Sequence, residues 1–441
     1  MTVAVLALIT IIAFEAMAIS TAMPVVAREL DAVRSYGLAF SVMLTAELLG
    51  IVLAGVWSDR AGSMPALVVG QLLVAGGSLV SGLSVSFPML LAGRAVLGLG
   101  GGLLAVCIYV VIGSAYPEAM RPRVFSWISA AWVLPSLVGP PIAGFLTTWS
   151  WRWVFLIVVP PLAVTLVIVL AQRHRIETAQ RAPEAAMDRS THLRTTRLGV
   201  GIALAATLLQ GGAERLAPLA ALPLILTVTG LLGIGLLYPR LVPAGTLRLS
   251  RGLPAVMASR LLLTAGFNGA ITFVPLMLVG GRGLTPAFAG LMLTIGALGW
   301  SLGSAIQGRD AFAHRKAELV ASGAGLLAAG TFTFALVAAL ELSHWLVAAG
   351  AVVAGLGMGL AMSSTSVLSL ALSAPRDHGR AASSLNLSDV LGSVLGISAA
   401  GAVFAALHDP SGDDRGVFVL MWLAMGAVAL VGVAAGRRSR S

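Results

Sequence analysis

The stretch that decides the fold stands near the start of the chain, where residues 2–24 read TVAVLALITIIAFEAMAISTAMP. Apart from Glu15 and a few small hydroxyl residues, this run is apolar. A helix needs about 20 apolar residues to cross the hydrocarbon core of a bilayer. The run therefore predicts a transmembrane helix that carries one carboxyl group in the middle of its apolar sequence.

The rest of the chain is built in the same way. Of its 441 residues, 58% are hydrophobic and 10% are charged, whereas soluble domains have about 25% charged residues. Such a chain cannot cover a water-facing surface, and it reads as a polytopic membrane protein. Only helices and closed barrels satisfy the backbone inside a bilayer, and apolar runs of this length are helices. The sequence predicts an all-α fold.

The apolar runs predict fourteen transmembrane helices. We expect them at about 2–24, 36–57, 65–86, 91–113, 124–147, 151–171, 198–213, 216–238, 254–279, 286–307, 316–339, 344–372, 379–407 and 416–436. The run at 198–213 is short. The alternative is therefore twelve spans, with that segment lying in the membrane interface.

The positions of the basic residues predict the orientation. With a cytoplasmic N-terminus, 20 of the 28 Lys and Arg residues fall in cytoplasmic loops or the C-terminal tail, six fall outside and two fall within spans. This bias agrees with the positive-inside rule. It accounts for the net charge of +10 without a soluble basic patch for nucleic acid. We expect a multi-pass protein of the plasma membrane with both termini in the cytoplasm.

The spans group into two halves. Residues 1–171 are expected to form an N-terminal six-helix bundle, and 172–197 a cytoplasmic loop. Residues 198–253 would hold two extra helices and a basic linker, and 254–441 a C-terminal six-helix bundle with a cytoplasmic tail. Two joined six-helix repeats are typical of secondary transporters, in which the halves rock to give alternating access.

The sequence argues against an enzyme and against ATP as the energy source. Lys316 is the only lysine, and it has no glycine-rich approach of the kind found in phosphate-binding loops. The histidines lie in loops or at span ends, and Cys107 is the only cysteine, so we expect neither a metal site nor a bound cofactor. An ion gradient is the expected source of energy.

Three carboxyl groups lie within expected spans: Glu15, Glu47 and Asp389. Ionisable residues at membrane depth are costly and are usually functional, and burial disfavours their charged form. We expect these carboxyls to couple transport to protons. The alternative is that each is simply hydrogen-bonded inside the bundle for packing. Arg94 is expected to be a charge partner facing the interior of the first half, or else to reach the outer interface. Arg260 also falls within a span.

Four motifs then resemble those of the drug:proton antiporters of the major facilitator superfamily. FEAMAISTAMP (14–24) is similar to the first-helix motif, with Glu15 at its acidic position. GVWSDRAG (55–62) resembles the loop motif after the second helix. LAGRAVLGLG (91–100) is similar to the fourth-helix motif, and PSLVGPPIAG (135–144) to the fifth-helix motif of exporters. The matching residues are Gly55, Asp59, Arg60 and Gly62 in the loop, Arg94, Gly98 and Gly100 in the fourth helix, and Gly139, Pro140 and Gly144 in the fifth.

The resemblance implies a major facilitator fold of the fourteen-helix branch, with two six-helix bundles and two extra central helices. GRAASSLNLSDVLGSVLG (379–396) also resembles that branch, and its Gly392 and Gly396 would permit close helix contact. In the fifth helix, Gly139 and Gly144 are expected to pack closely on a partner in the other bundle. At Asp389 the branch often carries a basic or amide residue, so no family role transfers to that position.

The implied function is proton-coupled export of small amphipathic compounds across the lipid bilayer, by a chain that we expect to be a monomer. The alternatives are a uniporter or importer of a small metabolite, and a non-transporting membrane protein of the same fold.

Overall fold

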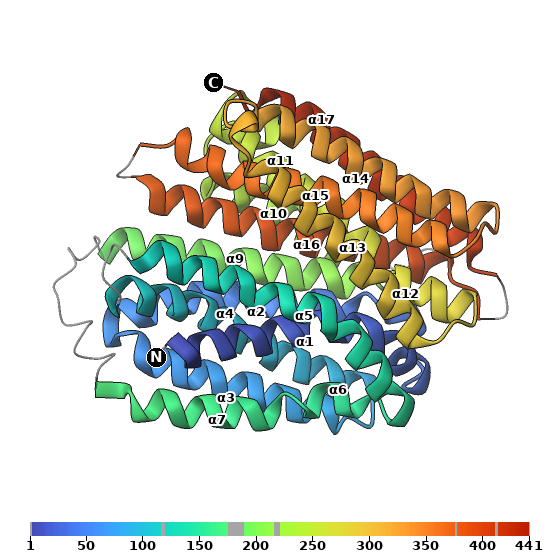
Figure 1. Ribbon diagram of the computed structural model, residues 1–441, viewed down its shortest axis with the longest axis horizontal. Helices are drawn as coiled ribbons and strands as arrows, with labels where there is room; N and C mark the ends of the chain where they lie inside the picture. The colour runs from blue at the N-terminus through green and yellow to red at the C-terminus, as the bar shows by residue number, and fades with distance from the viewer. Residues whose placement is uncertain are drawn as a thin grey trace. The chain divides into compact units, whose positions relative to one another are not determined.

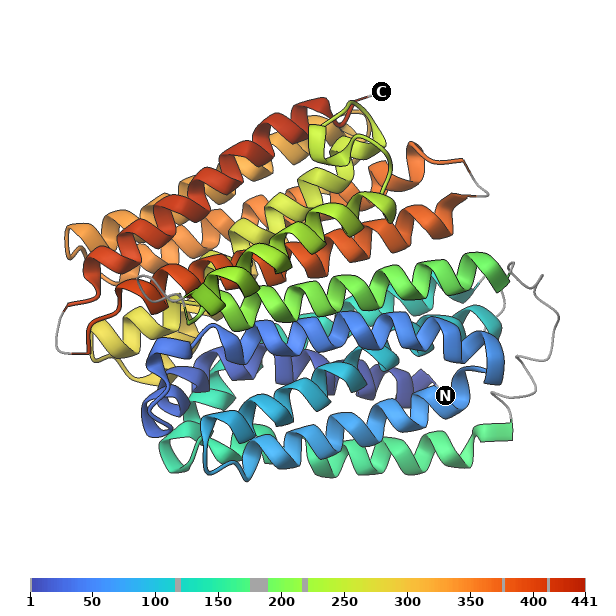
Figure 2. The ribbon, with the colours of Figure 1, turned by 180° about the vertical axis from the view of Figure 1, so that it is seen from behind.

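The computed structural model describes residues 2–115, 120–174, 189–215, 221–374, 377–410 and 413–440, and within them every regular element is a helix. The chain divides into two compact units. Unit 1 holds Met1–Ala32 and Val42–Ala203, and unit 2 holds Val33–Ser41 and Leu204–Ser441. In each unit the long helices run side by side as a bundle (Figures 1 and 2). The predicted all-α class is confirmed.

The helices up to the centre of the chain are α1 (Thr2–Glu29), α2 (Leu38–Ala61), α3 (Ser63–Gly82), α4 (Phe87–Ala115), α5 (Arg121–Trp149), α6 (Arg152–Leu156), α7 (Val159–Ala171) and α9 (Arg189–Ala213). A short 3-10 turn, η1 (Val33–Ser35), lies between α1 and α2. In unit 1, α1 packs against α5, and α3 packs against α4, α6 and α7.

The later helices are α10 (Ala221–Leu237), α11 (Leu253–Ile271), α12 (Val274–Leu276), α13 (Pro286–Gln307), α14 (Lys316–Ala339), α15 (Trp345–Ala371), α16 (His378–Leu407) and α17 (Arg415–Arg438). The shorter turns are η3 (Tyr238–Arg240), η4 (Thr246–Arg248), the π-helical η5 (Met277–Gly281) and η6 (Asp310–Phe312). In unit 2, α11 packs against α16 and α17, and α15 packs against α13 and α14.

Among the described residues, twelve helical segments are long and apolar enough to cross a membrane. The two further expected spans correspond to α5, with 29 residues, and α9, with 25 residues. Neither is among the twelve, so the expected count of fourteen spans is not confirmed. The chain is a multi-span membrane protein in either case.

Large apolar side chains on the outside of the helices fit a lipid environment. On α10, Leu222, Leu232 and Leu236 are each at least 60% exposed. In water, an exposed apolar stripe of this kind would favour aggregation. Against hydrocarbon it costs nothing, because lipid tails are as apolar as leucine.

Glycines permit the closest helix contacts in both units. A side-chain carbon on Gly98 of α4 would collide with the backbone carbonyl of Met43 on α2. In unit 2, side-chain carbons on Gly392 and Gly396 of α16 would collide with backbone carbonyls of Leu261 and Ala265 on α11. The close contact predicted for Gly392 and Gly396 is therefore confirmed.

Residues 189–197, which we expect in the cytoplasmic loop, form the first turns of α9. Hydropathy places the end of a span where charges begin, whereas arginines are good helix formers and extend a helix beyond the apolar run. The remainder of that loop, 175–188, lies outside the described residues. Within unit 1, Gly139 of α5 faces Met17 and Phe14 of α1. The expected close contact with the other bundle stays a prediction.

Candidate functional site

The structure brings Glu15 and Arg94 together. Glu15 lies midway along α1, and Arg94 lies in the second turn of α4. The guanidinium Nη1 of Arg94 donates a hydrogen bond to Oε1 of Glu15, and the two groups form an ion pair. The side chains are only 1% and 4% exposed, respectively. Arg94 therefore points into the interior of unit 1.

The surroundings of this pair are apolar. Ile11 and Ala18, which share the α1 stripe of Glu15, are 8% and 0% exposed. A single buried charge in such a place costs several kcal/mol, and a hydrogen-bonded counter-charge offsets part of that cost. Each partner is therefore tolerated because the other is present. Neutralisation of the Glu15 carboxylate must therefore weaken the electrostatic stabilisation of the Arg94 guanidinium.

A second ion pair lies in unit 2, between α11 and α16. Nη2 of Arg260 is 3.3 Å from Oδ2 of Asp389. Nη1 of Arg260 also donates to the carbonyl oxygen of Met362 at 2.9 Å and to Oγ1 of Thr365 at 3.0 Å, both on α15. The Asp389 side chain is 27% exposed. The sequence singled out Asp389 and Arg260 separately, but it did not predict that they meet.

Polar side chains extend this second site along α16. Nδ2 of Asn268 donates to Oγ of Ser393 at 2.9 Å, and Oγ of Ser393 donates to the backbone carbonyl of Asp389 at 2.9 Å. One turn away, the hydroxyl groups of Tyr238 and Ser388 are 2.8 Å apart. Nε of Arg260 is buried without a hydrogen-bond partner. The site therefore holds one donor that a ligand or a water molecule could satisfy.

The other predicted site residues belong to neither ion pair. Glu47 is half-buried on α2, where its backbone carbonyl approaches Gly102 of α4. Gly62, between α2 and α3, has φ of 75°, a backbone conformation that favours glycine. The side chains of Asp59 and Arg60 lie outside the described part of the structure.

The motif residues of α4 and α5 are helical and buried. Gly100 of α4 faces α3, where a side-chain carbon would crowd the carbonyl of Gly70. Pro140 lies inside α5, which continues as a helix from Arg121 to Trp149. Gly144 is buried on the same helix.

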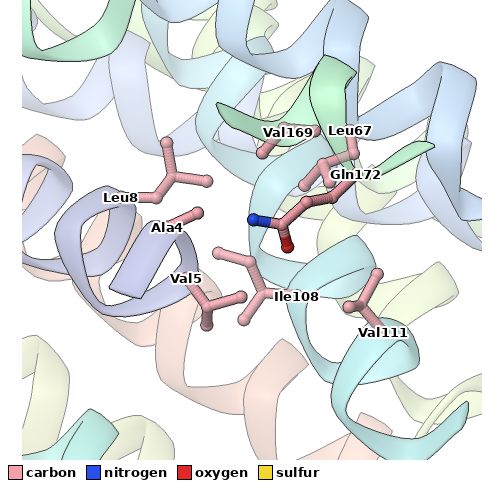
Figure 3. A pocket seen from close by; sticks show the side chains of 8 residues that line it. All are labelled: Ala4, Val5, Leu8, Leu67, Ile108, Val111, Val169 and Gln172. Carbon is pink, nitrogen blue, oxygen red and sulfur yellow. The ribbon is translucent and has the colours of Figure 1, made fainter. Parts of the chain in front are cut away.

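A small cavity lies among α1, α3, α4 and α7, and its lining includes no residue of the two ion pairs. Its lining is apolar except for Gln172, whose amide points inward (Figure 3); the other residues are Ala4, Val5, Leu8, Leu67, Ile108, Val111 and Val169. Its volume is about 10 Å³, at the lower limit for one water molecule. This cavity is too small to hold an organic substrate.

A further buried carboxyl was missed from the sequence. Glu214 follows α9 in the segment LQGGAER and is 8% exposed. Its position next to two glycines and an arginine is typical of a solvated turn. No local sequence signal distinguishes it from the other loop carboxylates, because its burial comes from residues distant in the chain.

The fold defines a helical, multi-span membrane protein. A sequence profile described as Major Facilitator Superfamily matches residues 5–338. The chain belongs to this superfamily, as its motifs suggested.

Curated relatives carry names of the same kind. A protein of Mycobacterium tuberculosis named "probable multidrug-efflux transporter" is 26% identical over 418 residues, covering 90% of this chain and 86% of that protein. A multidrug transporter protein of Bacillus subtilis, MdtP, is 25% identical over 398 residues, covering 88% and 72%. Other relatives are matched over less of their length: an MFS-type transporter of Metarhizium majus is 32% identical over 153 residues, which is 26% of that protein and 34% of this chain.

Solved structures agree on the fold. A peptide transporter POT in complex with sulfate has a TM-score of 0.69 at 15% identity, covering 99% of this chain and 96% of that one. A POT family transporter in complex with a thioalcohol-conjugated peptide has a TM-score of 0.70 at 17% identity, covering 97% and 94%. At these identities the likeness concerns the fold alone.

Proposed function

We propose that this chain is a proton-coupled antiporter of the plasma membrane that exports small amphipathic compounds by alternating access of its two halves. It would act as a monomer, with both termini in the cytoplasm and with no bound cofactor. The single observation that carries the proposal is the buried ion pair of Glu15 and Arg94 on α1 and α4. The names of the multidrug transporters among its relatives support the substrate class.

The pair offers a way to exchange a proton for a substrate. When Glu15 takes up a proton, its carboxyl becomes neutral, and the ion pair with the buried guanidinium of Arg94 is lost. Such a loss costs about 3–5 kcal/mol, which is enough to favour another arrangement of α1 and α4. Proton binding and that rearrangement are then linked, and the coupling acts equally in both directions.

A substrate would enter this cycle from the side opposite to the proton. In the inward-open state, Glu15 would release its proton to the cytoplasm as substrate binds. In the outward-open state, a more acidic exterior would protonate Glu15 again and favour release of the substrate. Glu15, Glu47 and Asp389 are three acidic residues within spans, a composition that favours lipophilic cations as substrates.

Accumulation in everted membrane vesicles tests this function. Export then appears as uptake into the vesicle, driven by an acidic interior. We expect uphill accumulation of a fluorescent lipophilic cation by the unchanged chain, and its loss in Glu15→Gln. Glu29→Gln is the matched control, since Glu29 ends the same helix and its side chain is 48% exposed in a pair with Arg152. Uptake by the unchanged chain that does not depend on the pH gradient would indicate a uniporter.

A further inference from the structure

Another buried carboxyl lies outside both ion pairs, in the turn that follows α9. Glu214 is 8% exposed, and its Oε2 atom is enclosed without a hydrogen-bond partner. A buried carboxylate oxygen without a donor is costly, whereas a protonated carboxyl needs fewer partners. The geometry at Glu214 therefore suits the neutral, protonated group.

The enclosure of Glu214 is built by residues distant in the chain. The side chain of Ser35 in η1 and the backbone N–H of Leu38 at the start of α2 are hydrogen-bond donors to its carboxyl group. Gly401 of α16 lies beside it, and a side-chain carbon placed on Gly401 would be 3.9 Å from Oε1 of Glu214. Glu214 thus lies where the connection between α1 and α2 meets α16.

The α1–α2 connection, residues 33–41, is held within unit 2 by several hydrogen bonds. Nε of Arg34 donates to the carbonyl oxygen of Ala405 at 2.7 Å. The hydroxyl of Tyr36 donates to the carbonyl oxygen of Thr272 at 3.0 Å, and Nε2 of Gln210 donates to the carbonyl oxygen of Ser41 at 3.0 Å.

This connection has a special place in the chain. Residues 33–41 cluster with unit 2, while the chain on both sides of them belongs to unit 1. A movement of the flanking chain would pull on both ends of the connection. Release of the hydrogen bonds that hold it would open a path for water to Glu214.

Exposure to water would change the affinity of Glu214 for protons. In the enclosed state, burial raises its pKa to about 8, while Ser35, the Leu38 N–H and Arg215 lower it by a smaller amount. In water the pKa of a glutamate is about 4.3. The enclosed state binds the proton more tightly, so enclosure takes up a proton and opening releases one. Between these two values, each increase of one pH unit favours opening about tenfold.

Three other charged or titratable groups lie near Glu214 in the chain or in the fold. Arg215, next in the chain, is the charge that acts on Glu214. Arg34 in η1 is bound to a carbonyl on α16. At the end of α16, His408 is paired with Asp414 at 2.8 Å. No second carboxyl is needed to explain the behaviour of Glu214.

We propose that Glu214 is a proton-binding site that is loaded when residues 33–41 close onto α16 and the turn after α9, and is unloaded when they part. With the orientation expected from the basic residues, this end of the bundle faces the outside. An acidic exterior would then favour closure of the outer end. A proton-driven exporter requires coupling in this direction. The role of Glu214 in transport rests on the proposed function, whereas proton binding by Glu214 and closure of the connection do not depend on it.

Thiol labelling tests closure without substrate and without a gradient. In a Cys107→Ala background, Ser41→Cys places a thiol in the connection, where Ser41 is 1% exposed. The full chain in proteoliposomes is treated with a membrane-impermeant maleimide at a series of pH values. Each rate is divided by the rate for the same protein unfolded in SDS, which removes the pH dependence of the reagent.

We expect the normalised rate to rise about tenfold per pH unit between about pH 5.5 and 7.5 and to level off above about pH 8. Glu214→Gln should label slowly at every pH, since its amide is neutral throughout. Asp31→Asn is the control, because Asp31 is an exposed carboxyl near the same connection, and it should keep the pH dependence of the parent.

Ser35→Ala gives an independent reading if Glu214→Gln does not reach the membrane. It removes a hydrogen bond that favours the charged carboxylate, so the rise should level off at a higher pH than in the parent. A parent rate that is independent of pH would overturn the proposal, as would a pH dependence that persists in Glu214→Gln or an unchanged upper limit in Ser35→Ala. None of these labelling measurements depends on whether the chain exports a substrate.

Discussion

The ion pair of Glu15 and Arg94 should behave as one energetic unit, and this can be measured with a double-mutant cycle. Arg94→Met removes the guanidinium and leaves a buried carboxylate, while Glu15→Gln removes the carboxylate and leaves a buried cation. The side chains are 1% and 4% exposed, so solvent screening is small. Loss of one member of a buried pair costs about 3–5 kcal/mol. Glu15→Gln should lie near the lower end, because its amide oxygen still accepts a hydrogen bond.

The double variant Glu15→Gln/Arg94→Met contains neither charge. Replacement of a whole buried pair is often neutral or stabilising by about 1–4 kcal/mol. The double variant should therefore be close to the unchanged chain, which gives a coupling energy on the order of 3 kcal/mol or more between the two positions. The exposed pair of Glu29 and Arg152, whose side chains are 48% and 33% exposed, should give about 0–1 kcal/mol in the same cycle.

The assay is the free energy of unfolding in mixed SDS and detergent micelles, followed by far-UV circular dichroism. If the two single-variant losses simply add in the double variant, the pair is not coupled and the reasoning is refuted. A transport assay of the double variant then separates an effect on folding from an effect on function. The double variant should be stable, but it should fail to accumulate substrate against a gradient, since the titratable carboxyl is gone. Uphill export with unchanged dependence on pH would move the proton site elsewhere, with Asp389 as the next candidate.

Three further variants test other parts of the molecule. Asp389→Asn should cost less stability than Glu15→Gln, below about 2 kcal/mol, because its side chain is 27% exposed and Arg260 keeps its bonds to α15; SDS unfolding measures the difference. Gly396→Ala should cost about 1–3 kcal/mol by overpacking against Ala265, whereas Gly379→Ala, which meets open space on the same helix, should not. Gly62→Ala should lower the unfolding free energy by about 1–3 kcal/mol, because φ there is 75° and ψ is 168°; thermal unfolding of Gly55→Ala, inside α2 with open space around it, should show no loss.

The helices were predictable because the signal for a membrane span is local. The run expected at 286–307 is α13, Pro286–Gln307, and the run expected at 316–339 is α14, Lys316–Ala339. In each case the apolar length and the charges at its ends lie within the segment itself. Where a helix extends beyond the membrane, as α9 does from Arg189, hydropathy marks the membrane boundary and not the helix boundary.

The partners of the buried charges were not predictable in the same way. Glu15 and Asp389 could be picked out one by one, because a carboxyl inside an apolar run is visible in the sequence. That Asp389 meets Arg260, and that Glu214 is enclosed by Ser35 and Leu38, depends on which helices and connections pack together. Gly139 shows the same limit, since its motif indicated close packing but not that the neighbour is α1.

The two ion pairs differ in a way that bears on their roles. Glu15 is almost fully enclosed and meets Arg94, whereas Asp389 is about one quarter exposed and shares Arg260 with Thr365 and Met362. Neutralisation of Asp389 would leave Arg260 its hydrogen bonds to Thr365 and to the carbonyl oxygen of Met362. At Glu15, entry of a proton requires that α1 and α4 open a path, and it removes the counter-charge of Arg94. This difference favours Glu15 over Asp389 as the site of the proposed proton coupling.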